Sequence, residues 1–256
     1  TGLTMTNDRF DQLFGGPRRA AESDLTQREM DIAASVQAVT EEVVIKLARG
    51  IRKSTDQKNL CLAGGVALNC VANGKLLRAG IFDEIWVQPA AGDAGGAIGA
   101  ALGAYYLMLN QPRTVYAGDS MKGSYLGPEY TQDEIEQRLS KAGAKFTSVT
   151  TQEMLSETAT ALAQGKAVGW HQGRMEFGPR ALGGRSIIAD PRSPVVQKQL
   201  NLKVKYRESF RPFAPSVLRE DVDQWFDINV DSPYMLMVAD VAKDRQLQMT
   251  PEQQKL

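Results

Sequence analysis

Arginine and glycine residues are concentrated in one stretch of the sequence, residues 173–186, which reads GRMEFGPRALGGRS. Guanidinium groups spaced along a glycine-rich loop present planar donors to phosphate oxygens, while the glycines and Pro179 fix a turn that longer side chains would obstruct. A second basic cluster follows at residues 203–213. Two such clusters in one region favour a small polyanion, such as ATP or carbamoyl phosphate, as the ligand. The second cluster alternates cations with aromatic residues: Lys203, Lys205, Tyr206, Arg207, Phe210, Arg211 and Phe213.

Two other interpretations of these basic clusters remain open. They could form a solvated surface whose charges pair with Asp190, Glu208 and Glu220, because exposed ion pairs are common and contribute little. They could also contact RNA, since arginine and aromatic side chains bind phosphates and stack on bases. The chain has 30 basic and 30 acidic residues, and this balance counts against a nucleic acid as partner.

Two glycine turns each follow a short apolar run. Gly64 and Gly65 precede Asn69, and backbone N–H groups in such a turn can approach a phosphate or nucleotide at a helix N-terminus. A tight turn that only closes a strand–helix unit explains this first pattern equally well. Asp93, in the second turn, could cap a helix or coordinate a hard cation. Because ligands bind beyond the carboxyl ends of strands in open α/β sheets, two successive turns of this kind favour binding.

The elements expected to position the two glycine turns come first in the chain. Thr26 and Glu29 form a capping-box pattern, which predicts a helix over about 26–52. Two successive strand–loop–helix units then predict an α/β sheet with crossover connections. These units comprise strands at 59–63 and 82–88 and helices at about 68–80 and 93–109. The apolar residues on one face of the first helix are Ile32, Val36, Val39, Val43 and Leu47.

A loss of periodicity between Asn110 and Gly127 predicts a linker at 113–126, with one domain at 1–112 and another at 127–256. The second domain is also expected to be mixed α/β. Its predicted helices are 131–142, 152–164 and 194–203, and its predicted strands are 167–172, 187–189 and 213–218, the last interrupted by Pro215. Residues 1–24 are expected to connect elements without a core of their own, and residues 243–256 to form a mobile loop.

Composition is that of an ordinary globular protein of 256 residues with 43% hydrophobic residues. No apolar run approaches the ~20 residues that span a bilayer, and the sequence predicts a cytoplasmic protein. Cys61, Cys70 and His171 cannot supply a zinc site of three or four Cys or His ligands. Both cysteines are predicted to be reduced, buried thiols.

Four strings carry a resemblance that covers essentially the whole chain: CLAGGVALNCVANGKL, QPAAGDAGGAIGAAL, GRMEFGPRALGGRSIIADPR and KYRESFRPFAPSVL. They closely resemble the O-carbamoyltransferases that include nodulation protein U and enzymes decorating aminoglycosides, cephamycins and ansamycins. The resemblance implies an α/β fold, with the C-terminal half of an ASKHA-type domain at 1–112 followed by a truncated YrdC-like mixed α/β domain at 127–256. The second domain would make carbamoyl adenylate from carbamoyl phosphate and ATP, and the first would pass the carbamoyl group to a substrate hydroxyl.

The resemblance also assigns roles to particular residues. Gly64, Gly65 and Asn69 resemble adenylate contacts, and Asp93 resembles a metal-coordinating carboxylate. ATP with Mg²⁺, and Fe²⁺ or another divalent metal in the parent enzyme, are the expected cofactors. The predicted phosphate and adenylate pocket has Arg180, Arg185, Lys205 and Arg207 in catalytic roles and Arg174 and Arg211 in nucleotide or phosphate binding.

Three departures from the family pattern affect these expectations. Family members begin with a half that supplies a His-x-x-x-His metal pair and an acid/base histidine, whereas this sequence has only His171. The sequence also stops before the family's C-terminal strands, so it is expected to be an internal fragment, inactive by itself, in which Asp93 alone holds metal poorly. Gly184 stands where Asn is usual, which would loosen the loop.

Two other functions remain open beside carbamoyl transfer to a natural product or oligosaccharide. A relative that transfers threonylcarbamoyl to tRNA would share both domain types and show salt-dependent RNA binding. A non-catalytic nucleotide-binding module would bind ATP without turnover. The expected partners are carbamoyl phosphate and a hydroxyl-bearing acceptor, and no membrane is expected. A homodimer is one of the oligomeric states left open. The sequence does not identify the acceptor.

Overall fold

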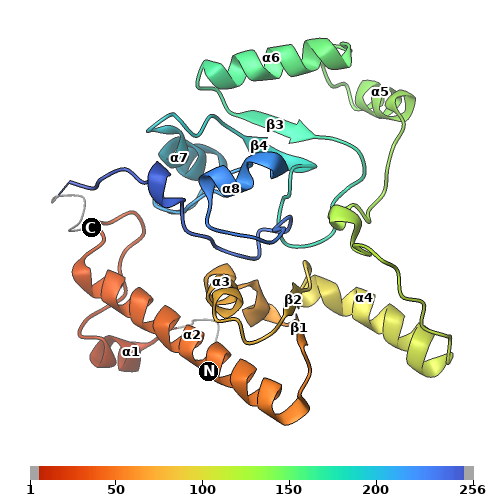
Figure 1. Cartoon of the computed structure of the whole chain (residues 1–256). Coiled ribbons are helices and arrows are strands. Elements are labelled where there is room, and N and C mark those ends of the chain that lie inside the picture. The colour runs from red at the N-terminus through yellow and green to blue at the C-terminus, as the bar shows by residue number, and fades with distance from the viewer. Residues whose placement is uncertain (1–5, 251–256) are drawn as a thin grey trace.

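Short apolar runs become strands in both halves of the chain. In the computed structural model, which describes residues 6–250, β1 (Asn59–Leu62) pairs in parallel with β2 (Glu84–Val87). β3 (Val168–His171) pairs antiparallel with β4 (Arg185–Ile188), so that His171 lies opposite Arg185 (Figure 1). The prediction of a mixed α/β chain is confirmed, although each sheet has only two strands.

One predicted strand is wrong. Residues 213–218 have no regular secondary structure. Pro212 and Pro215 lack the backbone N–H that a strand donates to its neighbour, and this explains why the apolar run does not join a sheet.

Three of the longer helices begin where the sequence supplies a capping box. Thr26, Thr131 and Thr150 each form a capping box with the glutamate three residues later. The helices are α1 (Asp8–Leu13), α2 (Gln27–Thr55), α3 (Cys70–Arg78), α4 (Asp93–Gly103), α5 (Gln132–Lys141), α6 (Thr151–Ala163), α7 (Val196–Gln199) and α8 (Val222–Trp225). Shorter 3-10 turns are η1 (Gly65–Leu68), η3 (Lys122–Ser124), η5 (Arg219–Asp221) and η6 (Lys243–Arg245), and π turns are η2 (Ala104–Met108) and η4 (Leu200–Val204).

Both ends of the described chain contain more local structure than the sequence predicts. α1 forms inside the stretch expected to connect elements, because the Asn7 side chain accepts a hydrogen bond from the backbone of Arg9. None of its residues is buried, so it contributes no core. The expected mobile loop contains η6, and residues 251–256 of that loop lie outside the described residues.

The long helix α2 is apolar on two sides. Ala48, with Val44 and Ile45, packs on a core cluster that includes Leu60 of β1 and Leu76 of α3. The face identified from the sequence points the other way, since Val36, Val39, Val43 and Leu47 are all exposed. Helical spacing therefore identified an apolar face, but not the one that packs in this fold.

A second core cluster joins segments that are far apart in the sequence. It contains Ala67 and Ala91 beside the two glycine turns, together with Met121, Tyr234 and Leu236. Asn73 Nδ2 donates to Ala67 O (2.8 Å) and to Leu236 O (2.9 Å), which fixes the last described segment against α3. Gly74 has no room for a side chain, because a methyl group there would lie 2.3 Å from Val238 O.

Much apolar surface stays exposed in this arrangement. The chain has 19,533 Å² of accessible surface, whereas a compact protein of 28.0 kDa exposes roughly 11,000 Å². The prediction of two buried thiols is wrong: both cysteines are unpaired, but Cys61 is exposed and Cys70 is half-buried. Cys61 is exposed because successive side chains of β1 face opposite sides of the sheet, and only one side is covered.

Within residues 6–250, no helix combines the length and the apolar character needed to cross a bilayer.

Tyr234 should make the stability of this core depend on pH. Burial, with the hydrogen bond to Asp119, raises the pKa of Tyr234 to about 12, from an ordinary value of 10.0. Because folding favours the neutral phenol, its contribution is complete below pH ~10 and is lost as the pH rises through about 12. Tyr234→Phe should therefore lower the free energy of unfolding by about 1 kcal/mol at pH 8 and have less effect as the phenol ionises. Urea unfolding followed by tryptophan fluorescence at both ends of this range would measure it, and a cost that does not change with pH would contradict the assignment.

Candidate functional site

The first glycine turn lies beyond the carboxyl end of β1 and is bonded to the second turn. Gly64 has φ +95°, a conformation that favours glycine, and its N–H donates to Ala91 O (2.8 Å). Gly65 begins η1, and a side chain there would meet no atom within 4 Å. Asn69 caps α3 by accepting from Ala72 N (3.0 Å), and its amide also donates to Gln37 Oε1 (2.9 Å). The Asn69 side chain thus has structural partners on two helices.

Asp93 begins α4 and is exposed. Gly92 occupies the N-cap position, so the Asp93 carboxylate does not cap the helix, but its charge lies in the first turn, where the helix dipole stabilises it. Within residues 6–250, no group of three or more His, Cys, Asp or Glu residues is placed to hold a metal ion. Asp93 alone does not make a metal site, because hard cations such as Mg²⁺ or Ca²⁺ take about six oxygen ligands.

The basic stretch 173–186 connects β3 to β4 and folds around a buried acid that was not singled out in the sequence. The Glu176 side chain is 0% exposed. Its carboxylate accepts from Leu182 N (3.1 Å), Gly184 N (2.7 Å) and Arg185 Nε (3.2 Å). These three donors replace the water that a solvated carboxylate would bind, and they hold the loop in a single conformation.

Gly184 is held firmly in this loop. Besides its bond to Glu176, its carbonyl accepts from Gln172 N (3.0 Å). A methyl group at this position would lie 2.6 Å from the ring of Tyr125. The absent side chain lets Tyr125 pack against the backbone here, and the expectation that glycine loosens the loop stays a prediction.

Arg180 connects the basic loop to the first glycine turn. Its Nη2 donates to Leu68 O (3.0 Å), and its Nε is buried with no partner in the described part of the chain. The loop also reaches the second turn, since a methyl group at Gly178 would lie 3.7 Å from Ala90 Cβ. Figure 1 shows the connection between β3 and β4 extending toward β2 and the start of α4. The three glycine-rich segments predicted separately thus meet in space.

The other arginines of the loop have structural bonds. Arg185 pairs with Glu176 and donates through Nη2 to Gly178 O (2.6 Å). Arg174 Nε donates to Gly127 O (3.0 Å). Both side chains fix the loop, and Arg185 Nη2 also donates to the backbone carbonyl of Arg180 (3.3 Å).

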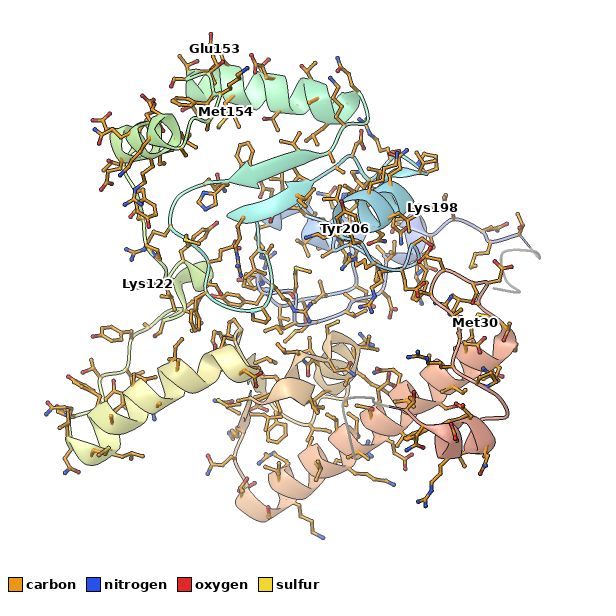
Figure 2. The ribbon with its side chains drawn as sticks, turned by 180° about the vertical axis from the view of Figure 1, so that it is seen from behind. Met30, Lys122, Glu153, Met154, Lys198 and Tyr206 are labelled. Carbon is orange, nitrogen blue, oxygen red and sulfur yellow. The ribbon has the colours of Figure 1, made fainter. Side chains whose placement is uncertain are left out.

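The second basic cluster follows η4 and surrounds a buried amide. Asn201 is 0% exposed, accepts from Arg207 Nε (2.6 Å) and donates to the carbonyl of Arg211 (2.8 Å). The Arg207 guanidinium lies over the ring of Phe213 at 4.8 Å. Tyr206, which is labelled in Figure 2, has φ +49° and is 86% exposed. Lys205 and Arg211 are exposed.

Two of the three acids that could have neutralised these cations are paired elsewhere. Asp190 pairs with Arg192 (2.5 Å), whose guanidinium lowers the pKa of Asp190 to about 2. Glu208 pairs with Arg19 (2.7 Å), which lowers the pKa of Glu208. Among residues 6–250, no ion pair involves Arg180 or a side chain of the second cluster. The pairing of these cations with Asp190 and Glu208 is therefore wrong, and the third acid proposed, Glu220, forms no ion pair among the described residues.

Two regions of the chain match one protein family. Residues 1–102 match the carbamoyltransferase N-terminus, and residues 159–252 match the carbamoyltransferase C-terminus. The meeting of the basic loop with the two glycine turns is thus a contact between the two matched regions.

Full-length relatives are considerably longer than this chain. A protein of Synechocystis sp. described as uncharacterized is 59% identical over 258 residues, which cover 100% of this chain and 42% of the relative. Nodulation protein NolNO of Sinorhizobium fredii is 43% identical over 86% of this chain and 32% of its own length. Nodulation protein NolO of Bradyrhizobium diazoefficiens is 44% identical over 79% of this chain and 36% of its own length. The chain therefore spans between 32% and 42% of the length of these curated relatives.

Replacing Glu176 should destabilise the loop. Glu176→Gln removes the charge and places an NH₂ group against backbone donors, so we expect a loss of about 3 kcal/mol in the free energy of unfolding. Glu220→Gln, at an exposed position of η5, is the matched control and should change it by less than about 0.5 kcal/mol. Urea unfolding would measure both, and equal losses would show that Glu176 does not hold the loop together.

Proposed function

The chain belongs to the carbamoyltransferase family, and from this premise we propose that it takes part in ATP-dependent carbamoyl transfer to a hydroxyl of a natural product or oligosaccharide. The observation that carries the proposal is the bond from Arg180 to Leu68 O, which joins the basic loop to the first glycine turn. Backbone N–H groups and a guanidinium at one place suit an adenylate phosphate.

The proposed reaction has two steps. In the first step, water takes up the phosphoryl group of carbamoyl phosphate as inorganic phosphate and leaves carbamate. A carbamate oxygen then attacks the α-phosphorus of ATP, whose bond to pyrophosphate breaks. The acceptor hydroxyl then attacks the carbamoyl carbon of the adenylate, AMP leaves, and the hydroxyl proton is released.

The cations of the chain would act electrostatically on the first step. Arg180, Lys205 and Arg211 have no acidic partner in the described structure, so their charge is available to phosphate oxygens. Stabilisation of charge that develops on oxygen is commonly the largest catalytic contribution of such groups. Arg185, Arg207 and Arg174 would contribute mainly by holding the loop and the second cluster in place, because each already has a partner within the chain.

Gly64, Gly65 and Asn69 would form the other side of the proposed nucleotide site. A methyl group added at Gly64 or Gly65 would meet no neighbouring atom within 4 Å, so a ligand can approach the backbone of both residues. Asn69 would act by positioning the N-terminus of α3, since its side chain caps that helix. A divalent metal at Asp93 would need ligands in addition to those described, and we route no step of the reaction through it.

Calorimetric titration of the chain with ATP and with a non-hydrolysable carbamoyl-adenylate analogue tests the proposal. We expect the analogue to bind and Arg180→Ala to weaken binding at least about tenfold, because a charge-assisted hydrogen bond contributes roughly 1.5–3 kcal/mol. Arg192→Ala removes an exposed guanidinium that pairs with Asp190, and should leave the affinity unchanged.

Circular dichroism would establish that each variant is folded. Folded wild-type protein that binds neither ligand, or an Arg180→Ala variant with unchanged affinity, would contradict the proposed site.

A further inference from the structure

Residues 19–23, called the clasp below, contact the second basic cluster from a distant part of the sequence. Arg19 Nη2 lies 2.7 Å from Glu208 Oε1, and its guanidinium carbon lies 6.0 Å from the centre of the Phe210 ring. Only 15% of the Arg19 side chain and 24% of the Glu208 side chain are exposed, so solvent screens this pair incompletely. The contact joins the region matched to the carbamoyltransferase N-terminus with the region matched to the C-terminus.

Glu22 adds a reciprocal pair of hydrogen bonds to this contact. Its N–H donates to Glu208 Oε2 (3.3 Å), and its Oε1 accepts from Ser209 N (3.2 Å). Glu22 has φ +58°, a left-handed conformation that is uncommon for residues other than glycine, asparagine and aspartate. Such a conformation persists only where the surrounding structure holds it, and these bonds to the cluster hold it here.

The clasp binds the turn that carries the free cations of the cluster. Glu208 is the only acid in residues 205–211, and it lies three residues from both Lys205 and Arg211. An unpaired carboxylate at this position would attract these cations and repel a phosphate group bound to them. Because Glu208 is bonded to the clasp, its charge is offset by Arg19 instead.

We propose that Arg19 is a positioning residue of the phosphate site. It holds Glu208 in the clasp and offsets its charge, so that Lys205 and Arg211 meet a polyphosphate without a competing carboxylate. This inference rests on the proposed function, in which both cations act on phosphate oxygens. It gives residues 19–23, which were expected only to connect elements, a part in that function.

Hydrogen exchange of the chain, followed by mass spectrometry without any nucleotide, tests the clasp itself. Arg19→Ala and Glu22→Ala should each speed exchange of the backbone amides in residues 205–211 at least about tenfold, because each removes charge-assisted hydrogen bonds. Arg18→Ala removes the neighbouring, exposed guanidinium and is the matched control, which should exchange as wild type does.

Calorimetric titration with inorganic pyrophosphate separates the charge effect from a loss of structure. Arg19→Ala should bind at least about fivefold more weakly than Arg18→Ala, which lowers the net charge by the same amount. The double variant Arg19→Ala/Glu208→Gln removes the uncovered carboxylate as well, and should recover affinity to within about twofold of wild type. If Arg19 touched the phosphate directly, or only held the fold, the double variant would bind no better than Arg19→Ala.

Unchanged exchange in Arg19→Ala, or a double variant that binds no tighter than Arg19→Ala, would overturn the proposal. A wild-type chain that binds no pyrophosphate would contradict the proposed function, and the positioning role with it, while faster exchange in Arg19→Ala would still establish the clasp.

Discussion

The buried carboxylate of Glu176 is the constraint on which the candidate site depends. A charge removed from water must be compensated by donors, and the loop between β3 and β4 supplies two backbone N–H groups and the Arg185 side chain. Satisfying the carboxylate closes the loop around it. That closure directs Arg180 to the carbonyl of Leu68 and brings Gly178 against Ala90, so one local requirement sets a contact between distant segments.

The sequence predicts the features that depend on neighbouring residues. The capping box at Thr26 located α2, and the apolar runs before the glycine turns located β1 and β2, because these signals act within a few residues. Glu176 was missed because an acid among arginines in a loop is ordinarily solvated. Its burial accompanies the packing of Tyr125 beside Gly184, and no local pattern reports that contact between distant residues. The packed face of α2 was missed for the same reason, since both of its faces carry apolar residues.

The failed strand prediction and a cavity of about 710 Å³ that residues 212–217 line have one physical origin. The run 213–218 is apolar enough for a strand, but its prolines cannot complete a ladder of hydrogen bonds. Left outside a sheet, the run places Phe213 and Val217 along an open wall. Places where a local rule correctly fails are often functional, and here the same segment also carries the Phe213 ring beneath Arg207.

Local pairing, and not overall charge, determines the field at the site. The chain is neutral overall, with 30 cations and 30 anions, yet Asp190 and Glu208 are paired with Arg192 and Arg19. Their lowered pKa values keep both acids ionised and bound to those arginines well below neutral pH. The charges of Lys205 and Arg211 therefore stay uncompensated by these acids over the physiological range, and a neutral protein can present a persistently positive surface to an anion.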